Sequence, residues 1–65
     1  MTWTEAARCL PAEGEEVETK IDDSRGVRNE QRMTYRNRLW WINVGEPGEM
    51  YVYYWPTHWR VVRDR

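Results

Sequence analysis

The sequence predicts a mainly β fold (a small α+β arrangement), in which a short N-terminal helical turn precedes a curled antiparallel sheet of four or five strands or a small barrel. Two observations support this prediction. Apolar and polar residues alternate in short runs, as in half-buried strands, and turn-forming residues separate the runs closely. None of the connections is long enough for a crossover between parallel strands, so antiparallel pairing is expected. The 65 residues are expected to form a single domain, 1–65.

The first predicted element is a helical turn over residues 4–9. Glu5 follows Thr2 at the spacing of a capping box, and Pro11 ends the turn because the residue before a proline avoids the α region. Cys9 is expected to pack within this turn. "PAEG" at 11–14 has the composition of a turn.

The next two elements are predicted strands. "EVETKID" at 16–22 alternates, and "DDSRG" then supplies turn residues, including a glycine suited to positive φ. "VRNEQRMTYR" at 27–36 also alternates. Uninterrupted alternation places Asn29 and Gln31 on the face that carries Met33 and Tyr35. It places a row of three arginines on the other face: Arg28, Arg32 and Arg36.

Three shorter strands are predicted near the C-terminus: 38–44, 50–55 and 58–62. "RN" at 36–37 and "GEPG" at 45–48 turn the chain, and Pro56 interrupts the stretch "MYVYYWPTHW" at 50–59. Alternation assigns one face of 50–55 to the core (Met50, Val52 and Tyr54). The opposite face is wholly aromatic (Tyr51, Tyr53 and Trp55).

The composition favours a binding protein over an enzyme. Five Trp, four Tyr and no Phe give every aromatic side chain a polar group, as is common at interfaces. His58 is the only side chain that ordinarily titrates near neutrality, and the Cys9 thiol is expected to be inert packing. No phosphate-binding glycine loop and no zinc-ligand spacing is visible. Neither catalysis nor a cofactor or metal is expected.

The charge distribution limits the class of partner. Residues 1–24 carry seven acids and two basic residues, whereas residues 25–65 carry eight arginines and four acids. These halves either neutralise each other or present an arginine-rich site. A pI near 5.8 does not fit binding to long nucleic acids. Because neither a signal peptide nor a membrane span is visible and the single Cys9 fits a reducing compartment, a cytoplasmic location is expected.

Three phrases resemble a known family: "LPAEGEEV" at 10–17, "RLWW" at 38–41 and "YYWPTHW" at 53–59. They are similar to the small phage and prophage proteins grouped as domain of unknown function DUF551, which open with a Trp, here Trp3, and close with a "THW" phrase, here Thr57, His58 and Trp59. The resemblance covers residues 3–62. It implies a phage or prophage origin and a small β-rich fold, and it brings no activity or catalytic residue with it.

The candidate ligand-binding residues combine aromatic rings, amides, arginines and the Thr–His corner: Arg28, Asn29, Gln31, Arg32, Trp41, Tyr53, Trp55, Thr57 and His58. A buried amide without a partner costs about 1–3 kcal/mol, so Asn29 and Gln31 are expected to meet backbone, a neighbouring subunit or a ligand. The arginine row either holds phosphates or pairs with acids of the neighbouring strand. Thr57 and His58 either form a structural corner or line the mouth of a pocket, and both can hold.

These features lead to two hypotheses about function. The first is a non-enzymatic phage protein that sequesters a nucleotide-derived host immune signal, possibly cyclic, in a pocket of aromatic, amide and arginine side chains. The alternative is an inhibitor that covers a host defence enzyme through a Trp/Tyr/Arg surface. A homo-oligomer is expected in either case, because strands 39–44 and 50–55 are apolar on both faces.

Overall fold

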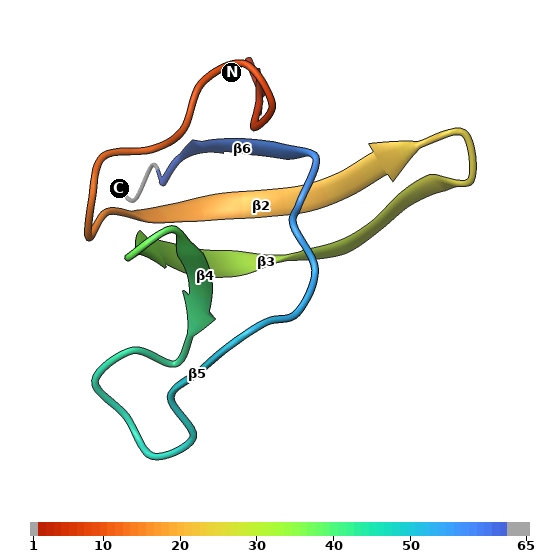
Figure 1. Cartoon of the computed structure of the whole chain (residues 1–65). Helices are drawn as coiled ribbons and strands as arrows, with labels where there is room; N and C mark the ends of the chain where they lie inside the picture. The colour runs from red at the N-terminus through yellow and green to blue at the C-terminus, as the bar shows by residue number, and fades with distance from the viewer. Residues whose placement is uncertain (1, 63–65) are drawn as a thin grey trace.

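The computed structural model describes residues 2–62 and shows one antiparallel sheet of six strands. The strands are β1 (Thr4–Glu5), β2 (Glu16–Asp23), β3 (Gly26–Arg36), β4 (Leu39–Ile42), β5 (Met50–Tyr51) and β6 (His58–Val61). Their order is β1-β6-β2-β3-β4-β5, and the sheet stays open (Figure 1). The predicted mainly β fold is confirmed. Of the two predicted forms, the open sheet is the one observed, not the closed barrel. The sixth strand is β1, whose two residues were expected in a helical turn.

The predicted N-terminal helical turn is wrong in its first residues. Thr4 and Glu5 pair with Trp59 and His58 as the edge strand β1. One hydrogen-bonded turn follows, in which the N–H of Cys9 donates to the carbonyl of Glu5 at 3.1 Å, and no helix occurs within residues 2–62. Cys9 is exposed instead of packed. Pairing with β6, a contact that is distant in sequence, overrides the local capping pattern.

The long β2–β3 hairpin contains a bulge that the alternation pattern did not predict. Thr19 lies opposite Gln31, but Ile21 lies opposite Arg28, so β3 has one extra residue there. Asn29, at the bulge, has a φ of 57°, a left-handed conformation that Asn tolerates better than most residues. The bulge reverses the faces beyond it. Arg28 therefore lies on the side of Gln31, and the row Arg28, Arg32 and Arg36 does not exist.

The later strands are shorter than predicted. Asn37 and Arg38, both with positive φ (53° and 66°), form the two-residue turn between β3 and β4. β5 ends at Tyr51, although the N–H of Val52 still donates to the carbonyl of Trp40 at 2.8 Å. The chain then leaves the sheet edge and passes across β3 and β2 to reach β6 (Figure 1). A crossing segment replaces the second half of the predicted strand 50–55.

The core lies on the face of the sheet that this crossing segment covers, here called the covered face. It consists of the buried apolar residues Ala6, Val17, Met33, Tyr35, Trp40 and Trp59. Val52 and Tyr54 pack against it from the crossing segment, as alternation predicts, whereas Met50 remains 54% exposed. The indole N–H of Trp59 donates to the carbonyl of Cys9 at 2.8 Å, which ties the N-terminal segment to the core.

The opposite face, here called the open face, is dominated by paired charges. Arg60 contacts Glu18 at 2.6 Å, and Arg36 contacts Glu49 at 2.7 Å. Trp3 lies over Lys20 and Arg60, with 4.4 Å from the ring centroid to Nζ and 4.2 Å to Cζ. These contacts agree with charge neutralisation across the sheet. Among the described residues, no helix is long and apolar enough to cross a membrane.

Candidate functional site

A mainly apolar depression lies where β1 and β6 meet the crossing segment. Its volume is about 440 Å³, and its lining is Glu5, Ala6, Ala7, Trp55, Pro56, Thr57 and His58. We call it the Trp55 depression. Trp55, Thr57 and His58 are three of the sequence-predicted site residues, and the structure brings them together. The predicted corner is thus also the rim of a pocket.

Thr57 fixes the position of this corner. Its N–H donates to the carbonyl of Lys20 at 3.0 Å, and its carbonyl accepts the N–H of Ala6 at 2.9 Å. Its hydroxyl oxygen accepts the N–H of Asp22 at 2.8 Å. One residue therefore connects β2, the segment after β1 and the start of β6, so the depression has a rigid base.

The hydrogen bonds of Thr57 also determine which nitrogen of His58 can meet a ligand. The Thr57 hydroxyl has one hydrogen, and it lies 2.7 Å from Nδ1 of His58 but 3.3 Å from the carbonyl of Lys20. That carbonyl already accepts the Thr57 N–H. Nδ1 of His58 is therefore occupied by the Thr57 hydroxyl, whichever of the two atoms donates. Among the described residues Nε2 has no hydrogen-bond partner, so it is the ring nitrogen left to meet a ligand.

Trp55 combines a fixed and an exposed part. Its ring lies edge-on to Trp40 and Tyr35, with centroid distances of 5.8 and 6.4 Å, yet the residue is 50% exposed. Tyr53, two positions earlier, is 95% exposed, and its ring contacts Tyr54 at 5.9 Å. Large aromatic side chains held in place and facing solvent are typical of interaction surfaces.

The remaining predicted residues do not converge on this depression. Gln31 donates through its side-chain amide to the hydroxyl of Tyr54 at 2.9 Å, so its amide nitrogen has a partner within the protein itself. Asn29 occupies the exposed bulge. Arg28 forms a two-point contact with the carboxylate of Asp23, at 2.9 and 3.1 Å. The hydrogen bond from Arg28, followed by that from the Arg25 N–H, lowers the pKa of Asp23 to about 2.

Arg32 and Trp41 lie instead on the open face. They share a depression of about 370 Å³ whose other lining residues are Glu16, Met33, Thr34, Asn43, Val44 and Glu46. A second hollow of about 250 Å³ also borders Arg32 and contains Trp3 and Arg60. Trp41 donates its indole N–H to the carbonyl of Arg36 at 3.0 Å, and the Arg36 guanidinium lies 4.2 Å from its ring centroid. Both of these hollows contain carboxylates beside the arginines.

Sequence reasoning missed Glu5, Ala6 and Ala7, the N-terminal side of the Trp55 depression. The expected helical turn gave no reason to place them beside residues 55–58. The pairing of β1 with β6 puts them there, and no local pattern in the sequence signals that pairing.

Comparison with known proteins does not assign the chain to a group: no family model, no curated protein and no solved structure matches it. The resemblance to DUF551 therefore stays a prediction. Among residues 2–62, no cluster of three or more His, Cys, Asp or Glu side chains is arranged to hold a metal ion.

Proposed function

We propose that this chain is a non-enzymatic binding protein that docks on another protein through the Trp55 depression and the adjoining Tyr53. The supporting observation is the exposure of Tyr53 at 95% and Trp55 at 50% beside a mainly apolar depression. Trp and Tyr dominate the binding energy of many protein interfaces. If the resemblance to phage proteins holds, the partner is a host protein, such as a defence enzyme that the chain inhibits by covering its surface.

The proposal is tested by recovery of a defined partner with wild-type protein and two variants. Tyr53→Ser removes the most exposed aromatic ring, and Ala7→Gln fills the depression with an uncharged polar side chain. Both positions are exposed, so stability is expected to change by no more than about 0.5 kcal/mol. Val27→Ala is the matched control, because Val27 is 51% exposed and lies on β3, outside the depression. Recovery that both variants abolish and the control retains supports the proposal, and equal recovery by all four proteins contradicts it.

A nucleotide-derived ligand is a second candidate, at the open face. The observation in its favour is that Arg32 borders both hollows there, with Trp41 in one and Trp3 in the other. An indole can stack on a base while a guanidinium holds a phosphate. Isothermal titration with cyclic dinucleotides and cyclic ADP-ribose isomers tests this function. Binding that Arg32→Gln weakens supports it, and absence of heat at large molar excess of every ligand contradicts it.

A further inference from the structure

We propose that the bulge in β3 prevents the β2–β3 hairpin from pairing edge to edge with a second copy of the chain. The inference concerns the chain's association with itself, whereas the proposed function concerns a partner protein. The two are independent, because neither Asn29 nor Glu30 lines the Trp55 depression. Three observations support the inference: the open edge of β3, the position of the bulge on that edge, and the pairing that would remain without it.

The hairpin has one long open edge. β2 pairs with β6 over residues 17–20, and beyond this pairing the Asp22 N–H donates to the hydroxyl of Thr57 at 2.8 Å. β3 pairs with β4 over residues 34–36 alone, and within the described part of the chain no strand pairs with the outer side of residues 27–31. These five residues are exposed, and the hairpin extends past β4 and β6 (Figure 1). An edge of this kind offers backbone N–H and C=O groups to a strand of another chain.

The bulge lies in the middle of this open edge. Asn29 and Glu30 of β3 together lie opposite the single residue Lys20 of β2, between regular pairs on both sides. A bulge bends its strand, increases the local twist and interrupts the regular spacing of the outward backbone groups. A straight strand from a second copy therefore cannot follow the edge of β3 across Asn29. Bulges at exposed edges protect natural sheets from pairing between molecules in this way.

The register of the hairpin does not need the extra residue. Without Asn29, Glu30 alone would lie opposite Lys20, and the pairs on both sides would keep their present partners. Glu30 and Lys20 have opposite charges, so this cross-strand pair would favour the hairpin. The strands β2 and β3 would thus form a regular ladder with an edge open to a second copy. Protection of that edge gives the bulge a role that the pairing of β2 with β3 does not.

The experiment deletes Asn29 and compares this variant with the wild type and with Asn29→Gly, which keeps the extra residue and therefore the bulge. Sedimentation equilibrium measures the concentration at which half of the chains are associated. Deletion is expected to lower this concentration by roughly tenfold or more, whereas Asn29→Gly should remain close to the wild type. Equal association of the deletion variant and the wild type overturns the inference, and so does an equal increase in both variants.

Two further substitutions in the deletion variant locate the added association. Tyr51→Lys lies on β5 and should leave it in place. Glu30→Pro should remove it. The Tyr35 N–H donates to the carbonyl of Glu15, on the β2 side, so alternation directs the N–H of Glu30 towards the outer edge. A proline there lacks the donor that a second copy needs, yet is tolerated on an edge strand. Loss of the added association in Tyr51→Lys, or its persistence in Glu30→Pro, overturns the inference.

A substitution that keeps the bulge tests the inference without the deletion. Charged side chains also protect sheet edges, and Glu30 is an exposed charge on β3. Glu30→Thr removes this charge and retains the extra residue. Association no stronger than that of the wild type supports protection by the bulge, and clearly stronger association assigns the protection to the charge and overturns the inference. Circular dichroism checks that every variant is folded, and Glu30→Thr decides the question if the deletion variant is not.

Discussion

At the scale of single residues, Thr57 has a larger structural role than its half-buried position suggests. Its hydroxyl completes the β2 edge by accepting the Asp22 N–H at 2.8 Å, just beyond the Lys20–His58 pair. Thr57→Val keeps the shape but leaves that N–H without its partner, so a loss of about 1–3 kcal/mol in unfolding free energy is expected. Thr57→Ser keeps the hydroxyl, so its loss of unfolding free energy should be smaller. Urea denaturation measures both, and equal stability of the valine variant and the wild type would contradict this role for the hydroxyl.

The Asp23–Arg28 contact is a residue-scale feature with a predictable pH dependence. The pKa of Asp23 in the folded chain is about 2, below its ordinary 3.8, mainly because Arg28 donates to its carboxylate. A lowered folded-state pKa means that the stabilisation is complete above the ordinary pKa and is lost as pH falls from about 4 towards 2. Carbon-13 NMR titration of the Asp23 carboxyl group measures this directly. In Arg28→Gln the midpoint should rise towards 3.8, and an unchanged midpoint would show that Arg28 is not the main cause.

At the scale of elements, the bulge in β3 decides which residues of the hairpin share a face. Asn29 adopts a φ of 57°, which a β-branched side chain strongly disfavours. Asn29→Val is therefore expected to cost about 1–3 kcal/mol in stability, whereas Asn29→Gly should be close to neutral, because glycine enters this region without a steric penalty. Thermal unfolding of the two variants and the wild type measures this difference in stability. Asn29 is also a sequence-predicted ligand residue, and Asn29→Gly leaving partner binding unchanged would agree with its absence from the lining of the Trp55 depression.

The same hairpin shows what sequence patterns predict at this scale and what they do not. Alternation located β2 and β3 almost to the residue, because one face of each strand must be buried and the period of a strand is fixed. Alternation did not predict the bulge at Asn29, because an inserted residue is not visible in the pattern of a run of exposed polar side chains. The N-terminal side of the Trp55 depression was missed for another reason. Thr4 and Glu5 pair with residues at the far end of the chain, and local propensity carries no information about such a partner.

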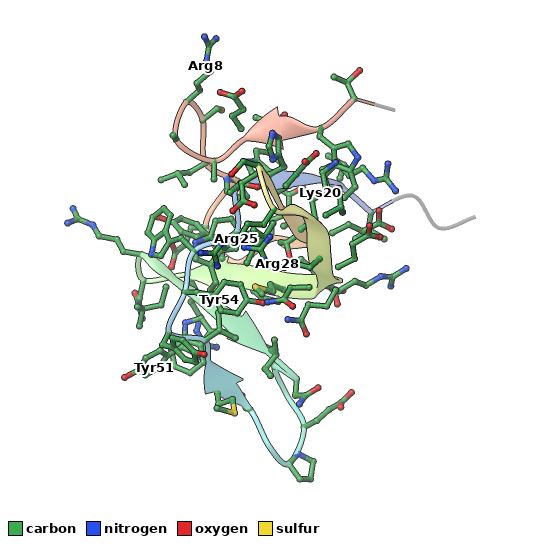
Figure 2. All side chains as sticks on the ribbon, turned by 90° about the vertical axis from the view of Figure 1, so that its right-hand side faces the viewer. Arg8, Lys20, Arg25, Arg28, Tyr51 and Tyr54 are labelled. Carbon is green, nitrogen blue, oxygen red and sulfur yellow. The ribbon has the colours of Figure 1, made fainter. Side chains whose placement is uncertain are left out.

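At the scale of the whole molecule, two exposed apolar regions of the described surface bear on binding. One is the Trp55 depression, beside the Glu5–Arg8 contact. The other is the open face of β4 and β5, where Trp41 lies opposite Tyr51 with ring centroids 5.6 Å apart, near Val44 and Leu39. Figure 2 shows Arg8 and Tyr51 towards opposite ends of the molecule. The sequence-based expectation of a homo-oligomer remains a proposal, and this second region is where it would act.

The oligomer proposal predicts that the average mass in solution rises above 8.0 kDa with concentration. Tyr51 is 52% exposed on an edge strand of only two residues, so a second copy can cover its ring and that of Trp41 together. Tyr51→Lys places a charge at this contact and should shift the association to much higher concentration, since an unpaired buried charge opposes the interface. Tyr53→Ser serves as the control, because its ring packs against Tyr54 and not against Trp41. Sedimentation equilibrium with all three proteins tests the assignment. A wild-type chain that stays monomeric at every concentration contradicts self-association, and equal weakening by both substitutions contradicts its location on β4 and β5.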